Sequence, residues 1–238
     1  MAASSDRHKG PGRDHAGHAP WSGLSAYAGS RGATFVTAVF IIAGQAWLAN
    51  SLGLRPVWPF SALSGVLLIA SVAVYRSDRA EPSMAMRWSA RAVVGALALS
   101  NAACLFYLVR GVFTKSGLDP LGLLFAGVVL WAVNTAVFAL AFWETDGGGP
   151  EDRTRDSGKL PDLVFPQQQA DQEGLAPKGW TPSFLDYFYV SLTAATAFSP
   201  TDVMPYSKTA KVLMGLDSTL SFAIVVMLIA RAVNIATG

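Results

Sequence analysis

The sequence predicts an all-α membrane protein with five transmembrane helices and a re-entrant, pore-type half-helix between spans four and five. Of its 238 residues, 52% are hydrophobic and only 14% are charged, whereas a soluble domain carries about 25% charged residues. Five stretches approach or exceed the roughly 20 apolar residues that a spanning helix needs. A shorter amphipathic segment near the C-terminus leads into a Ser/Thr/Pro turn. Irregular backbone at membrane depth requires cover from protein or water, which favours a re-entrant loop.

The N-terminal residues 1–30 are predicted to be a disordered tail. The first 20 residues are polar, rich in Gly and Pro, and lack the apolar core of a signal peptide. All three histidines lie in this tail, and a solvated tail explains them better than a metal site. The predicted spans then follow at about residues 33–52, 57–75, 92–113, 121–143 and 207–233.

The remaining chain is predicted to have two parts. Residues 31–116 form a three-helix transmembrane part, and residues 117–238 form a pore-like module with an outer helix, an acidic loop, a half-helix, a filter-like turn and an inner helix. The acidic loop, residues 144–181, has eight acids, four bases and four prolines. We expect it to be mobile and mostly irregular.

Polar residues inside the spans divide into two groups. Gln45, Asn101 and Asn134 are expected to hydrogen-bond between helices. Asp217 lies ten residues into the last span, which is about 15 Å along a helix. An acid at this depth is unfavourable unless it faces a bundle interior or water, so Asp217 is a functional candidate together with Ser221, one helical turn later. The alternative is an acid that only holds helices together. We expect this face to point toward a subunit axis.

Residues 186–205 read DYFYVSLTAATAFSPTDVMP. This segment and the helix after it resemble the pore region of two-helix potassium channels, in which a Thr-rich half-helix precedes the filter motif T-T-V-G-Y-G-D and a later proline. Thr196, Asp202 and Pro205 fall on matching positions without a gap. The resemblance implies a homo-oligomer, by analogy a tetramer. It also implies a filter-like turn made of Thr196, Ala197, Phe198, Ser199, Pro200, Thr201 and Asp202.

The filter-like turn departs from the potassium-channel motif in composition. Ser199 and Thr201 replace both glycines, Pro200 takes the aromatic position, and Ala197 replaces the second threonine. Potassium filters present backbone carbonyls to the ion, and glycine allows the left-handed backbone that this requires, whereas proline does not. We therefore expect no potassium selectivity of the usual kind.

The whole chain also resembles a large bacterial family of integral membrane proteins known only as a domain of unknown function. The resemblance rests on the basic loop between spans two and three, on Asp186–Tyr189, on Thr196–Asp202 and on Ala232–Ile235. It implies a multi-pass protein of a bacterial-type plasma (inner) membrane, and it implies no activity.

Two rules for membrane orientation disagree. A potassium-channel-like pore would place the acidic loop outside and the C-terminus inside. The positive-inside rule places the tail and that loop in the cytoplasm, because few bases lie on the opposite side: Arg55, Arg110, Lys115 and Arg231. Either the loop opens inward, or residues 182–199 span as a sixth helix, or the rule fails. We favour an inside N-terminus with a re-entrant segment.

The function expected from these features is a homo-oligomeric, cation-conducting pore in contact with membrane lipid and inorganic cations. The alternatives are an ion-coupled carrier that uses Asp217 and Asp202, and a non-conducting envelope scaffold or interaction protein whose axis is plugged by Phe198 and Pro200. An enzyme is not expected, because no histidine lies in a span and no Ser/His/Asp set can assemble there. No cofactor or metal site is expected, and the scattered bases argue against nucleic-acid binding.

Overall fold

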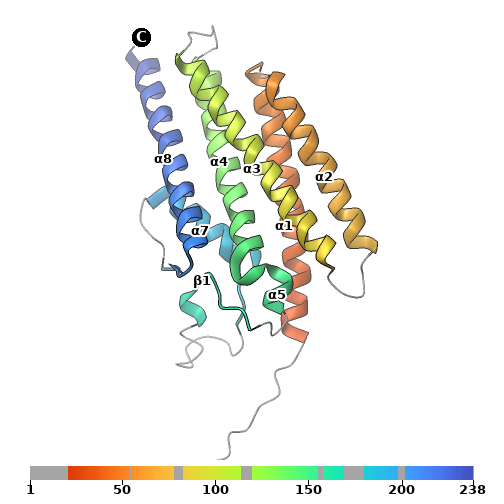
Figure 1. Ribbon diagram of the computed structural model, residues 1–238. Coiled ribbons are helices and arrows are strands. Elements are labelled where there is room, and N and C mark those ends of the chain that lie inside the picture. Colours follow the sequence, from red (N-terminus) through yellow and green to blue (C-terminus); the bar gives the residue numbers. More distant parts are fainter. Residues whose placement is uncertain are drawn as a thin grey trace, which may run out of the picture.

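Five long helices run side by side in a computed structural model of the chain (Figure 1): α1 (Trp21–Ser51), α2 (Trp58–Ser77), α3 (Met84–Phe113), α4 (Pro120–Thr145) and α8 (Lys208–Thr237). The structure describes residues 21–53, 55–77, 83–113, 120–154, 158–168, 180–197 and 202–237. Within these described ranges, five apolar segments are long enough to cross a membrane: Ser30–Ser51, Arg55–Ser77, Met84–Gly111, Leu121–Gly148 and Lys208–Val233. The prediction of a multi-pass helical protein with five spans is confirmed at this level.

The ends of these helices differ from the predicted spans where the helix continues beyond its apolar stretch. Helix α1 begins at Trp21, within the predicted tail, and α3 begins at Met84, eight residues before the predicted span. Hydropathy marks only the part of a helix that fits the hydrocarbon core. Helices α1 and α2 are joined through Gly53, which has a φ of 63°, and the short helix η1 (Arg55–Val57).

Helix α4 is the central helix of the bundle. It packs against α1, α3, α7 and α8, and its Leu130, Val133 and Ala139 are fully buried. Glycines bring two of these neighbours close. A Cβ added at Gly44 of α1 would lie 2.6 Å from Val133, and one added at Gly127 of α4 would lie 2.5 Å from Leu228 of α8. Small residues at helix contacts are the usual means of close packing in lipid.

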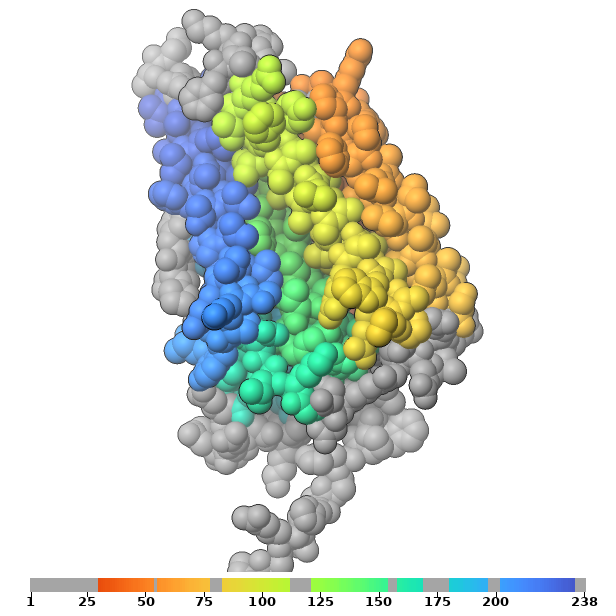
Figure 2. All heavy atoms as spheres, in the orientation of Figure 1, coloured from red at the N-terminus to blue at the C-terminus, as the bar shows by residue number. Residues whose placement is uncertain are grey.

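The long helices pack closely side by side in the space-filling view of Figure 2, and many of their large apolar side chains are exposed. Phe106 of α3 is 60% exposed and Phe222 of α8 is 50% exposed. Ile69 of α2 is 72% exposed. Exposed apolar patches of this extent mark a surface that is covered in the native setting, and here lipid is the natural cover.

The segment between α4 and α8 is more ordered than predicted. It contains η2 (Asp146–Gly148), α5 (Pro150–Thr154), β1 (Leu163–Val164), α7 (Phe184–Ala197) and β2 (Met204–Pro205). Strands β1 and β2 pair antiparallel, with Leu163 opposite Pro205. The expectation of a mostly irregular loop is wrong for the described residues, because buried side chains bind its backbone, as set out below. Residues 155–157 and 169–179 of this loop lie outside the described part of the chain.

Helix α7 lies close to the end of the bundle at which α4 ends and α8 begins (Figure 1). We call this end, with η2, α5 and the β1–β2 pair, the cap end. Helix α7 packs against α4, α8 and α1. It has 14 residues, which is about 21 Å, whereas the hydrocarbon core of a bilayer is about 30 Å thick.

Candidate functional site

A layer of buried polar side chains crosses the middle of the bundle. Its members are at most 3% exposed and come from α3, α4, α7 and α8: Asn101, Asn134, Thr135, Ser191, Asp217 and Ser221. We call this set the polar layer. Polar groups buried to this degree are expected to be hydrogen-bonded, because an unpaired one is unfavourable by several kcal/mol in hydrocarbon.

Asp217 is the only ionisable member of the polar layer. Its Oδ2 lies 2.7 Å from the Ser191 hydroxyl of α7, and its Oδ1 lies 3.3 Å from the Ser221 hydroxyl on its own helix. The Ser191 hydroxyl also lies 2.8 Å from the carbonyl oxygen of Thr135 on α4. Asp217 and Ser191 therefore join three helices at one point. The spacing of four residues places Ser221 on the same face of α8 as Asp217.

Amide side chains extend the polar layer to α3. The Asn134 amide donates to the Ser221 hydroxyl over 3.0 Å, and the Asn101 amide donates to the Asn134 side-chain oxygen over 2.8 Å. Nearby, the Gln45 amide of α1 donates to the Leu97 carbonyl over 3.0 Å. These contacts confirm the prediction that Gln45, Asn101 and Asn134 hydrogen-bond between helices.

The face of α8 that carries Asp217 lies inside the protomer. Asp217, Ser221 and Ile224 are all 0% exposed, and α8 packs on α4 and α7. The expectation that this face points toward a subunit axis is wrong, because α4 and α7 of the same chain cover it. The spacing of polar residues identified the polar face of α8 correctly. The same spacing is expected whether that face lies at an axis between subunits or at a helix contact within one subunit.

The described residues of the predicted filter-like turn, Thr196, Ala197 and Asp202, are not members of the polar layer. Thr196 is exposed on the last turn of α7, where its hydroxyl donates to the Leu192 carbonyl over 2.8 Å. Ala197 ends the helix, and Asp202 is exposed. Phe198, Ser199, Pro200 and Thr201 lie outside the described residues. Of the predicted site residues, the structure thus brings together Asp217 and Ser221 but not Thr196 or Asp202 with them.

A second buried site, at the cap end, was missed by the sequence reasoning. The Asp146 carboxylate accepts the backbone N–H groups of Asp162 over 2.7 Å and of Leu163 over 2.9 Å. It also accepts the Tyr187 hydroxyl of α7 over 2.5 Å. Arg153 donates to the carbonyl oxygens of Asp146 and Trp143 over 2.6 and 2.8 Å. Its guanidinium carbon lies 4.6 Å from the centre of the Trp143 ring, a cation–π distance.

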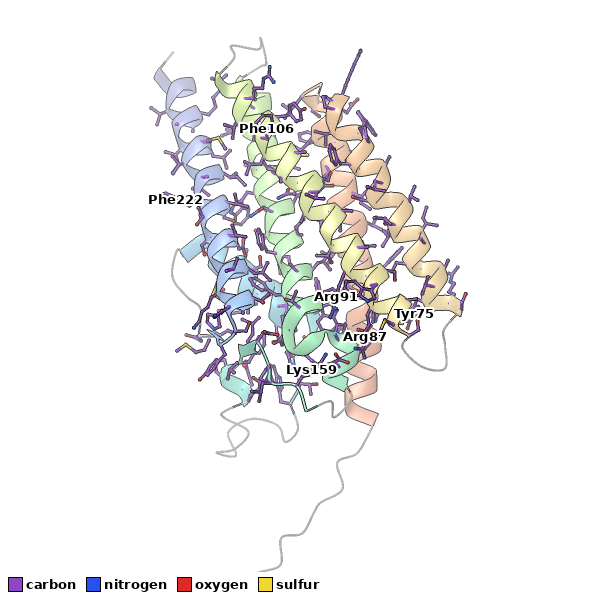
Figure 3. The ribbon with its side chains drawn as sticks, viewed as in Figure 1. Tyr75, Arg87, Arg91, Phe106, Lys159 and Phe222 are labelled. Atoms are coloured by element: carbon purple, nitrogen blue, oxygen red, sulfur yellow. The ribbon has the colours of Figure 1, made fainter. Side chains whose placement is uncertain are left out.

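Ion pairs connect the cap end to α1 and α3. Arg31 of α1 pairs with Glu151 of α5. Arg87 of α3 and Lys159 pair with Asp152 at 2.5 and 2.6 Å, and in Figure 3 both bases lie at this end of the bundle. The Lys159 hydrogen bond, together with the Arg87 charge, lowers the pKa of Asp152 although its burial acts in the opposite direction. We call the ion-paired set Arg31, Arg87, Glu151, Asp152 and Lys159 the cap cluster.

The three consecutive glycines of the acidic loop have a structural reason. Gly147, Gly148 and Gly149 have φ values of 58°, 88° and 105°, which favour glycine over residues with a Cβ. A Cβ at Gly148 would also lie 2.6 Å from an Asp152 carboxylate oxygen. The carbonyl of Gly148 accepts Arg91 of α3 over 2.7 Å. A sequence signal for this site existed, since the acids at 151–152 and the basic residues of α3 fall on the same side of the membrane in a five-span topology.

No metal-ligating group of three or more His, Cys, Asp or Glu side chains occurs among the described residues. Comparison with known proteins found no family model that matches the chain, no curated protein with significant similarity and no solved structure that matches it.

Proposed function

We propose that the protein is a channel-like, homo-oligomeric pore of a bacterial-type plasma membrane, in which α7 is a re-entrant half-helix and residues 196–202 form the constriction. The observation that carries the proposal is the placement of α7. It packs against both α4 and α8, so that an outer helix, a short helix and an inner helix lie in the order found in two-helix potassium channels.

The path of the chain around α7 supports re-entry. Helix α4 ends and α8 begins at the same end of the bundle (Figure 1), so the segment that contains α7 leaves from that end and returns to it. With about 21 Å of length, α7 reaches part of the way into a core of about 30 Å. This favours a half-helix over the alternative of a sixth span.

The chemistry at the end of α7 suits a cation. Helix C-termini carry a partial negative charge from their unpaired carbonyl groups, and Thr196, on the last turn, is exposed. Asp202, which follows the turn, is exposed as well. Because Ser199, Pro200 and Thr201 replace the residues of a glycine-based filter, the proposed pore is not potassium-selective in the usual way. On this proposal the protein is not an enzyme, and its partners are lipid, inorganic cations and other copies of itself.

Cysteine accessibility tests the proposal directly, because the native chain has a single cysteine, Cys104, which is 1% exposed. We expect Thr196→Cys in proteoliposomes to react with a charged, water-soluble thiol reagent from the same side as Asp202→Cys, and the reaction to reduce cation flux. The matched control is Ile229→Cys, since Ile229 is 59% exposed on the apolar face of α8 and should stay unreactive. Reaction of Thr196→Cys and Asp202→Cys from opposite sides would indicate a sixth span, and an unreactive Thr196→Cys would contradict the aqueous path.

Flux through the Pro200→Gly variant tests the constriction separately. Glycine removes the fixed φ of proline, so we expect a larger cation leak from vesicles than with the native chain. Pro166→Gly, an exposed proline elsewhere in the same loop, is the control and should leave the leak unchanged. Equal leaks in all three proteins, together with no flux in the native chain, would favour the non-conducting scaffold.

An ion-coupled carrier is the second candidate, because the one buried acid of the polar layer is enclosed within a single protomer. Asp217 is 0% exposed and is bonded to hydroxyls of α7 and α8, which is an arrangement that could hold an ion during a transport cycle. Flux that saturates with substrate and follows an imposed gradient would favour the carrier over the pore.

A further inference from the structure

The Ser191 hydroxyl lies between two oxygen atoms that both need its hydrogen. It is 2.7 Å from Asp217 Oδ2 and 2.8 Å from the Thr135 carbonyl oxygen. A serine hydroxyl has one hydrogen to donate, and a carbonyl oxygen can only accept. If Ser191 donates to Thr135, the contact between Ser191 and Asp217 contains a hydrogen only when the carboxyl group supplies it.

The other carboxyl oxygen of Asp217, Oδ1, accepts a hydrogen bond from Ser221. Ser221 accepts the Asn134 amide over 3.0 Å, which leaves the Ser221 hydrogen free to point to Asp217 Oδ1 over 3.3 Å. With a proton on Asp217 Oδ2, each of the four contacts contains one hydrogen: Asn134 to Ser221, Ser221 to Asp217 Oδ1, Asp217 Oδ2 to Ser191, and Ser191 to the Thr135 carbonyl. An ionised carboxylate would instead take the Ser191 hydrogen and leave two oxygen lone pairs facing each other across 2.8 Å at Thr135.

The surroundings of Asp217 offer no compensating charge in the part of the chain that the structure describes. On α4 the ionisable group is Glu144, next to the cap end, and β2 has none. On α7, Tyr187 donates to Asp146 and Asp186 accepts Ser183, while Tyr189 is 55% exposed. On α8 itself the bases are Lys208, Lys211 and Arg231, and the ion pairs described do not include Asp217. A charged carboxylate that is fully buried without a cation is strongly unfavourable.

We propose that Asp217 binds an exchangeable proton and that this proton fastens α7 to α4 and α8. The latch consists of Asp217, Ser191 and the Thr135 carbonyl. Loss of the proton removes one of the two Ser191 contacts and leaves a charge that needs water, so α7 separates from α4 and α8. The latch lies within one protomer and holds whether or not the oligomer conducts, so it goes beyond the proposed pore.

Infrared spectroscopy of the full chain in lipid nanodiscs tests the proton itself. We expect a protonated-carboxyl band at neutral pH that shifts in heavy water, disappears as the pH rises, and is missing in Asp217→Asn. The control Asp202→Asn removes an exposed carboxyl group and should leave the band in place. Identical spectra from the native chain and Asp217→Asn would overturn the proposal.

Hydrogen–deuterium exchange of the α7 amides, corrected for the pH dependence of intrinsic exchange, tests the latch. We expect the α7 amides of the native chain to exchange roughly tenfold faster at pH values where the carboxyl band is lost. Separation of α7 from α4 and α8 removes the hydrogen bonds of Ser191 that hold α7 in place. Asp217→Asn, whose amide donates to Ser191 without ionising, should keep α7 protected at every pH. Ser191→Ala should weaken protection at every pH while keeping the carboxyl band, which provides a second variant that does not alter the acid.

Two results would overturn the latch without reference to flux. One is the same pH dependence of α7 exchange in Asp217→Asn as in the native chain. The other is α7 protection that follows sodium concentration at constant pH, which would assign the site to a monovalent cation in place of a proton. Neither measurement depends on transport. The result for the proton latch can therefore be read separately from the result for the proposed pore.

Discussion

Two of the buried aspartates, Asp146 and Asp217, are accommodated by different partners. Asp146 receives two backbone N–H groups and the Tyr187 hydroxyl, which are donors suited to a charged carboxylate. Among the residues that the structure describes, the Asp217 carboxyl group meets only the hydroxyls of Ser191 and Ser221. The first arrangement fixes a loop to the end of the bundle, and the second joins helices in the middle. The partners, and not the depth of burial, separate the two roles.

The sequence revealed only one of these two residues. Asp217 was recognisable because it interrupts an apolar stretch, and Ser221 follows it at helical spacing. Asp146 was not, because it stands among eight acids in a segment that looks solvated. Its partners Leu163 and Tyr187 lie 17 and 41 residues away, and no local pattern encodes such contacts.

Asp152 predicts how stability depends on pH at the cap end. Lys159 and Arg87 lower its pKa, so its ionised form stabilises the folded state above the usual aspartate pKa of about 3.9, and that stabilisation is lost as the pH falls through the lowered value. We expect Asp152→Asn to lower the unfolding temperature by a constant amount between about pH 5 and 7. The difference from the native chain should shrink below about pH 4.

Lys159→Met provides the matched variant for this measurement. It removes one partner of Asp152 but keeps the pair with Arg87, so its loss of stability should be smaller and should fade over the same acidic range. If the difference in unfolding temperature between the native chain and Asp152→Asn grew as the pH fell, the lowered pKa of Asp152 would be contradicted.

At the scale of elements, apolar length predicted the five spanning helices but not their contacts. Helix α4 became the central helix because Gly44 and Gly127 allow α1 and α8 to approach it closely, and isolated glycines in apolar stretches do not indicate which of them face a neighbour. For the ordered cap the sequence shows only that acids and bases lie on the same side of a five-span topology, and it does not show which of them pair, since Arg31 and Arg87 precede their partners Glu151 and Asp152 by 120 and 65 residues.

The contact between α4 and α8 is expected to be sensitive to the size of residue 127. A Cβ at Gly127 would lie 2.5 Å from the Leu228 side chain, so Gly127→Val should force the two helices apart. We expect a loss of about 1–3 kcal/mol, typical of overpacking, seen as a lower unfolding temperature in detergent. Gly65→Val is the control, because nothing lies within 4 Å of a Cβ at that position. Equal unfolding temperatures for both variants would rule out a tight contact at Gly127.

At the scale of the whole molecule, the polar layer lies inside the protomer, whereas the end of α7 is exposed. Asp217 is enclosed within the protomer, whereas Thr196 is exposed. Because the Asp217 face of α8 is buried, it is not available to other copies, and in the proposed oligomer we expect the copies to meet near the exposed end of α7. The potassium-channel resemblance placed both the end of α7 and the Asp217 face of α8 at an axis between subunits. The burial of Asp217 within the folded chain distinguishes the two.

Disulfide cross-linking tests this arrangement of copies. If the ends of α7 from neighbouring protomers surround a common axis, Thr196→Cys should form covalent dimers on mild oxidation in membranes. Leu185→Cys is the matched control, because Leu185 is 71% exposed near the start of the same helix and should not cross-link. A monomeric Thr196→Cys protein of the same yield as the native chain would count against the proposed assembly.

The cap cluster has a consequence for biosynthesis. Arg31 and Arg87 leave the ribosome well before their acidic partners Glu151 and Asp152. During that interval these two acidic partners are not yet part of the chain, and basic residues near span ends bias the orientation of inserting helices. The later pairing neutralises these charges in the finished protein. Under the positive-inside rule the same arginines would bias the orientation of the nascent chain, and in the folded chain they join α1 and α3 to α5.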